Sequence, residues 1–71
     1  MSEEAILLDR RVGRTMNTIQ RVFGSARMRR VREETRTLMQ REVPDFSQLP
    51  EDVQDMVRAA EKLQIEEHAL L

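Results

Sequence analysis

Pro44 and Pro50 divide a chain that otherwise consists of residues that favour helices. Proline disfavours helical backbone in the residue before it, so a helix that approaches Pro44 is expected to end near Val43. Pro50 fits the first turn of a new helix, and the two acidic residues after it suit the positive end of a helix dipole. The remaining sequence lacks the alternation of apolar and polar residues that is typical of strands. The sequence therefore predicts an all-α fold with a turn at about 44–50.

Before this turn, the apolar residues follow the helical repeat in two separate stripes. The first stripe lies at about 2–23 and consists of Leu8, Val12, Met16, Ile19 and Phe23. The second lies at about 26–43 and consists of Met28, Val31, Leu38 and Met39, with Thr35 on the same side. At roughly 100° per residue, the second stripe is rotated by more than about 90° from the first. A bend near Gly24 and Ser25 would align the stripes, whereas one continuous helix would point its two halves at different neighbours.

Gly13 lies inside the first stripe, and it weakens a helix there by roughly 1 kcal/mol relative to alanine. After the turn, a third helix is expected at about 50–69, with Val53, Met56, Val57, Ala60 and Leu63 on one face. The predicted architecture is a helical hairpin or small three-helix bundle that forms a single domain over 1–71. A chain of this size buries a small core, and without cysteine it has no disulfide. Helix packing and partners must therefore stabilise it.

Charge is distributed unevenly along the chain. Residues 1–44 carry ten arginines against six acidic residues, for a net charge of +4. Residues 45–71 carry two basic residues against seven acidic ones, for a net charge of −5. The two parts are therefore expected to attract each other when the chain reverses direction at the turn.

The segment RVFGSARMRRVREETR, residues 21–36, contains six of the eleven arginines. In one interpretation it is a solvated or protein-docking helix face, partly neutralised by glutamates one turn away. Arginine suits protein interfaces because its planar guanidinium group pairs with carboxylates through two hydrogen bonds. In the other interpretation the segment contacts the phosphates of a nucleic acid. The candidate contacts are then Arg27, Arg29, Arg30, Arg32 and Arg36.

Two properties of the chain favour protein docking over nucleic acid binding. The isoelectric point is about 5.8, and only two aromatic residues are present for stacking on bases. A helix-turn-helix motif with Gly24 in its turn also matches poorly, because Ser25 and Arg30 stand where apolar residues are needed. Nucleic acid binding through residues 21–36 is therefore kept as the alternative.

No motif in the sequence points to catalysis. The single histidine, His68, cannot form the histidine cluster of a typical zinc site, and none of the serines has a histidine nearby in sequence. We therefore predict no enzymatic activity, no metal, no cofactor and no small-molecule substrate.

The two ends of the sequence bear on localisation. The start is acidic and its apolar run, residues 5–8, is too short for a secretory signal. No stretch approaches the roughly 18 apolar residues of a membrane span, so we expect no membrane association and a cytoplasmic location. The segments EEAILL and EEHALL, at 3–8 and 66–71, resemble acidic dileucine sorting signals. We interpret both as helix-end packing.

These features predict a small non-catalytic protein–protein interaction module, such as a regulator, adaptor or assembly chaperone. It is expected to dock through apolar helix faces framed by arginine, because one copy of so short a chain does not easily bury two stripes that point in different directions. The partner is another protein or the chain itself, and a homodimer that forms a four-helix-like bundle is the leading version. The predicted interface residues are Leu8, Val12, Met16, Ile19, Phe23, Val31 and Leu38.

Overall fold

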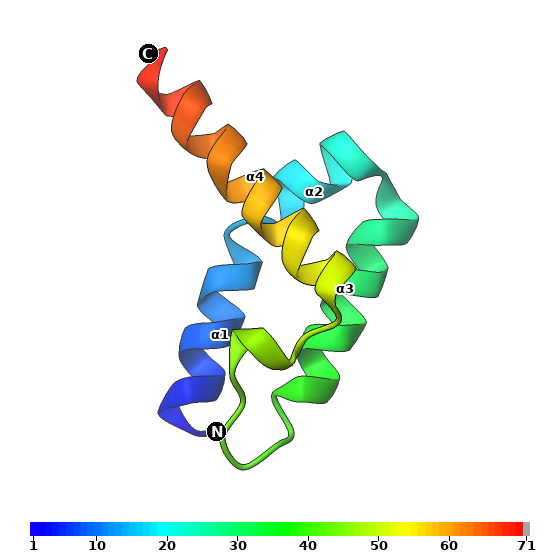
Figure 1. Cartoon of the computed structure of the whole chain (residues 1–71), viewed down its shortest axis with the longest axis vertical. Coiled ribbons are helices and arrows are strands. Elements are labelled where there is room, and N and C mark those ends of the chain that lie inside the picture. Colours follow the sequence, from blue (N-terminus) through cyan, green and yellow to red (C-terminus); the bar gives the residue numbers. More distant parts are fainter. Residues whose placement is uncertain (71) are drawn as a thin grey trace.

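The computed structural model describes residues 1–70, and these residues form an all-helical bundle (Figure 1). Its elements are α1 (Glu3–Gly13), α2 (Met16–Phe23), α3 (Ser25–Leu38), the short 3-10 helix η1 (Phe46–Gln48) and α4 (Glu51–Ala69). This part of the chain contains no β-strand, so the predicted all-α class is confirmed. The chain reverses direction between α3 and α4, where the turn was predicted.

The helices are arranged in two layers. α1 and α3 pack against each other, and the short α2 joins them at one end of the molecule (Figure 1). α4 crosses this layer diagonally and contacts both α2 and α3. The last turns of α4 extend beyond the rest of the bundle (Figure 1). No helix within residues 1–70 combines the length and the apolar character that crossing a lipid bilayer would require.

The first predicted helix, at about 2–23, is in fact two helices. α1 ends at Gly13, and the chain changes direction at Arg14 and Thr15 before α2 begins. The backbone N–H of Thr15 donates to the carbonyl of Val12 at 3.0 Å, and its hydroxyl group donates to the same carbonyl at 2.7 Å. Because Thr15 is fully buried, this turn is packed into the molecule and is not a frayed end. The expectation of one continuous segment is therefore corrected.

Gly24 produces the second bend. Its backbone has φ 97° and ψ 164°, a region that side-chain-bearing residues rarely adopt, and it alone separates α2 from α3. Of the two alternatives left open by the sequence, the structure has the bend and not the continuous helix. α3 also ends at Leu38, five residues before the predicted end at 43. This early end lets the following loop insert Phe46 and Leu49 into the core.

The core consists of the apolar faces of all four helices and this loop. Its buried members are Leu8, Val12, Ile19, Met28, Val31, Leu38, Phe46, Leu49, Val53, Met56, Val57 and Ala60. Around the core, three ion pairs join the basic part of the chain to the acidic part. They are Arg11–Glu61, Arg21–Glu67 and Arg30–Asp52. The charge distribution predicted attraction between residues 1–44 and residues 45–71. These ion pairs place that attraction where α4 contacts the other helices.

The two dileucine-like segments differ in how far the structure describes them. In EEAILL, Leu8 is buried in the core and Leu7 is exposed, so the leucine pair is not presented together at the surface. EEHALL ends at Leu71, which lies outside the described residues.

Candidate protein-docking grooves

The seven predicted interface residues lie in or against the core of a single molecule. Leu8, Val12, Ile19, Val31 and Leu38 are buried there, and Met16 and Phe23 are partly buried against it. The two bends explain this placement, because they turn both apolar stripes toward one interior, where the stripes cover each other and the apolar face of α4. The expectation that these residues together form an exposed docking face is therefore corrected.

The five arginines predicted as nucleic acid contacts are all exposed on α3. Arg30 is paired with Asp52 of α4, and Nη2 of Arg32 donates to Sδ of Met28 at 3.4 Å. Among residues 1–70, no hydrogen bond or ion pair engages the side chains of the other three, Arg27, Arg29 and Arg36. Arg29, Arg32 and Arg36 follow one another at spacings of three and four, so they line one side of the helix.

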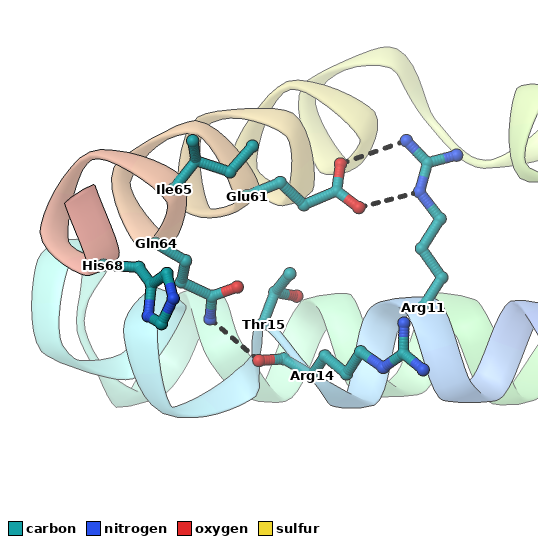
Figure 2. A pocket seen from close by; sticks show the side chains of 7 residues that line it. All are labelled: Arg11, Arg14, Thr15, Glu61, Gln64, Ile65 and His68. Carbon is teal, nitrogen blue, oxygen red and sulfur yellow. Dashed lines mark hydrogen bonds and ion pairs between the residues drawn. The ribbon is translucent and has the colours of Figure 1, made fainter.

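A first groove of about 510 Å³ lies between α4 and the junction of α1 with α2 (Figure 2). Figure 2 shows Arg11 and Glu61 facing each other across it. Nε and Nη2 of Arg11 donate to the two carboxylate oxygens of Glu61 at 2.9 and 3.1 Å. These hydrogen bonds raise the pKa of the Arg11 guanidinium above its ordinary value, against the opposing effect of burial. The ion pair therefore connects α1 to α4.

Gln64 makes a second connection in the same groove. Its side-chain amide donates to the carbonyl of Arg14 at 2.8 Å and to Oγ1 of Thr18 at 2.9 Å. Arg14 is the C-cap residue of α1, and the bend leaves its carbonyl without an N–H donor from the helix. The Gln64 amide of α4 supplies the missing hydrogen bond. With the Arg11–Glu61 pair, this contact accounts for much of the polar lining of the groove. We interpret the first groove as the place where α4 is fastened to the other layer.

A second groove, the α1–α3 groove, has a volume of about 480 Å³. It is lined by Met1, Asp9, Val12, Gly13, Met16, Arg32, Thr35, Arg36 and Met39. Arg11 of α1 and Arg30 of α3 form ion pairs with α4. Gly13 and Arg32, which line the α1–α3 groove, come two positions after these arginines. Two positions correspond to about 200° around a helix axis. The α1–α3 groove therefore opens on the side of the bundle that α4 does not cover.

The lining of the α1–α3 groove combines apolar and cationic groups. Met16 and Met39 are partly buried against the core, and methionine side chains adapt readily to irregular apolar partners. A Cβ atom added to Gly13 would meet nothing within 4 Å, so the wall is open at that point. Arg32 and Arg36 lie one helical turn apart on α3, and Asp9 of α1 also lines the groove. The groove thus suits an apolar segment that carries negative charge.

Thr35 adds an unusual polar group to this groove. Its residue is 4% exposed, and Oγ1 has no hydrogen-bond partner within residues 1–70. Buried hydroxyl groups are normally satisfied, because an unpaired one costs about 1–3 kcal/mol.

Four residues of the α1–α3 groove were predicted as site residues from the sequence, but the groove itself was not. Val12 and Met16 belong to the predicted interface, and Arg32 and Arg36 to the predicted nucleic acid contacts. The other lining residues, Met1, Asp9, Gly13, Thr35 and Met39, were not among the predicted interface or nucleic acid contacts. The position of Gly13 inside an apolar stripe was the available signal, since a residue without a side chain leaves a gap beside neighbouring helices.

Comparison of the chain with models of protein families, with curated proteins and with solved structures finds no match. Residues 1–70 contain no group of three or more histidine, cysteine, aspartate or glutamate side chains placed to hold a metal ion. The candidate site consists of the α1–α3 groove and the arginines beside it.

Proposed function

We propose that this chain is a non-catalytic helical interaction module of the cytoplasm, such as a regulator, adaptor or assembly chaperone. It binds an apolar segment of a protein partner in the α1–α3 groove. The observation that carries the proposal is the uncovered, methionine-lined groove with two exposed guanidinium groups, those of Arg32 and Arg36, at its edge.

The chemistry of the groove favours a protein segment as the ligand. A groove that lies between two helices accepts a row of side chains from a helix or an extended segment. Methionine supplies an apolar surface that adapts to the shape of such side chains. Arginine forms charge-assisted hydrogen bonds with carboxylates, which fix the orientation of the segment. The proposed partner segment is therefore apolar on one side and acidic at its edge.

Nucleic acid binding is the second candidate function, and one observation favours it. Arg27, Arg29 and Arg36 are exposed on α3, and no acidic side chain among residues 1–70 pairs with them. Phosphate contacts weaken steeply as salt rises, whereas apolar docking responds little. The protein partner is preferred because Arg36 and Arg32 border an apolar groove, which phosphates would leave empty.

Photo-crosslinking from two matched positions tests the proposal. A photoreactive phenylalanine analogue replaces Asp9, at the edge of the α1–α3 groove, or Asp55, an exposed aspartate of α4. In cells that produce the chain, we expect a protein adduct at Asp9 that is absent at Asp55 and is lost when Arg36→Glu is added. Equal protein adducts at both positions, or none at Asp9, would refute the proposal. An adduct at Asp9 that nuclease removes would favour the nucleic acid alternative.

A further inference from the structure

We propose that the end of α4, residues 61–70, is a latch that ion pairs and hydrogen bonds hold closed, and that it opens while the rest of the fold stays intact. When the latch is closed, its carboxylates occupy guanidinium groups of α1 and α2. These groups are available to another molecule only when the latch opens. The inference goes beyond the proposed function, because it concerns the first groove and not the α1–α3 groove.

The apolar anchoring of α4 ends halfway along the helix. Its buried residues all lie in the first half, and they are Val53, Met56, Val57 and Ala60. None of residues 61–70 is buried. Leu63 is partly buried outside the core, and Ile65 is exposed. Because burial of apolar surface is the main stabilising contribution to a fold, the end of α4 lacks most of what holds the first half in place.

Polar side chains at spacings of three hold this end instead. Glu61 pairs with Arg11 of α1, and Glu67 pairs with Arg21 of α2 at 2.8 and 3.1 Å. Between them, Gln64 donates two hydrogen bonds to the junction of α1 with α2. Residues three apart lie on the same side of a helix, so the three contacts form one row along α4.

Both ion pairs in this row are open to water. The side chains of Arg21 and Glu67 are 57% and 45% exposed, and those of Arg11 and Glu61 are 41% and 33% exposed. Ion pairs this exposed contribute little, and salt screens them. A helical segment of about ten residues is marginal without tertiary contacts. The latch therefore opens from the end of the helix inward, and the outermost pair, Arg21–Glu67, separates first.

Opening changes the surface that the chain presents. It frees the guanidinium group of Arg21 and then that of Arg11, and it moves the carboxylates of Glu67 and Glu61 away from them. The hydroxyl group of Thr18, a residue that is 6% exposed in the closed form, returns to water. The open form thus offers an acidic partner two arginines that the closed form keeps paired, and such a partner would shift the population toward the open form.

Hydrogen exchange of single amides, followed by NMR, tests the latch. Protection factors in α4 are measured at about 0.05 M and about 1 M sodium chloride. At the higher salt, protection of residues 65–69 should fall about twofold to fivefold, while that of residues 56–60 stays unchanged. Glu67→Gln should cause a similar fall at low salt. The matched control is Glu66→Gln, which removes the same charge at a position without an ion pair among residues 1–70, and it should not.

A charge exchange across the outermost pair separates the contact from the general effect of charge at a helix end. Arg21→Glu places like charges together and should lower protection of residues 65–69. Adding Glu67→Arg should restore it, because the pair then forms with its charges reversed. Adding Glu66→Arg brings the same charge to the same turn of α4 without facing residue 21, so it should not restore protection.

Several outcomes would overturn the latch. Equal loss of protection along all of α4 at high salt would mean that the helix moves as one unit. Unchanged protection of residues 65–69 at high salt would mean that charge does not hold the end. Equal effects of Glu67→Gln and Glu66→Gln, or of the two double variants, would show that the Arg21–Glu67 contact is not part of it. Crosslinking from Asp9 is independent of these measurements, so the proposed function stands or fails separately.

Discussion

The guanidinium carbon of Arg11 lies 3.8 Å from the ring centroid of Phe46, and the same guanidinium group is hydrogen-bonded to Glu61. One side chain from α1 thus connects the loop before α4 with α4 itself. A cation over an aromatic ring contributes about 0.5–1 kcal/mol at exposed sites, and an exposed ion pair contributes a similar amount. Arg11 therefore makes two modest contacts that both hold α4 and the loop before it against α1.

Replacing Arg11 should destabilise the fold more than replacing Glu61. Arg11→Met keeps an unbranched apolar stem but loses both contacts, so we expect a loss of about 1–2 kcal/mol in the free energy of unfolding. Glu61→Gln loses only the ion pair and should cost no more than about 1 kcal/mol. Urea denaturation measures both. Arg14→Met, whose side chain lines the same groove but makes no ion pair within residues 1–70, is the control and should change little. An equal loss at Arg14 would contradict the expectation.

The two glycines should respond to alanine in opposite directions. Gly24→Ala forces a side chain onto a backbone with φ 97°, and we expect it to cost about 1–3 kcal/mol of stability. Gly13→Ala lies in helical backbone with open space around the new methyl group, and should stabilise the chain by about 0.4–1 kcal/mol. Thermal denaturation of the two variants gives the comparison. A loss of stability in the Gly13 variant would contradict the expectation.

Truncation of apolar side chains should distinguish the core from the surface. Ile19 is 0% exposed, so Ile19→Ala should lower the free energy of unfolding by about 2–5 kcal/mol. Val22 lies on the same helix but is 49% exposed, so Val22→Ala should fall within about 0.5 kcal/mol of the natural chain. Phe23 is only partly buried, so Phe23→Ala should cost less than the roughly 3 kcal/mol of a fully buried phenylalanine. Denaturation by urea ranks the three variants, and any other order would count against this core.

Removing the amide of Gln64 should loosen the bend between α1 and α2. Gln64→Ala loses its hydrogen bonds to the Arg14 carbonyl and the Thr18 hydroxyl group, each contributing about 0.5–1.5 kcal/mol. Amide hydrogen exchange should then become faster around Thr18, while exchange in α3 changes less. Lys62→Ala, on the exposed side of α4, is the control. Unchanged protection in the Gln64 variant would show that the bend is held by packing alone.

The sequence was sufficient for the helical class and for the loop that follows α3, because proline acts on the backbone within one residue of its own position. The bend at Gly24 was one of two open alternatives for a similar reason, since glycine permits an unusual backbone but does not demand it. The bend at Arg14 and Thr15 has no such residue at its centre. It depends on burial of the Thr15 side chain and on the amide of Gln64, 49 positions later, which no local pattern contains.

The candidate site was harder to predict than the fold. The stripes that contain Ile19 and Val31 indicate that a surface will be covered, but not whether the same chain covers it. The bends at Arg14–Thr15 and at Gly24 turn both stripes toward one interior, so the same chain covers them. The α1–α3 groove depends on how α1 packs against α3, and no local pattern in the sequence contains that contact. Arg32 and Arg36 were predicted as contacts from the sequence, but the α1 residues that line the same groove with them could not be paired with them in advance.

The single-residue connection at Gly24 also bears on how fast the chain folds. α1, α2 and α3 follow one another with links of one or two residues, so most contacts among them join neighbours in sequence. Helical domains with such local contacts fold within microseconds to milliseconds. Only α4 must return over a longer loop, residues 39–50, and its acidic side chains approach a basic layer of helices as it does so. Closure of α4 is then the step that excludes water from the core, and the speed of that step should fall as salt screens the attraction.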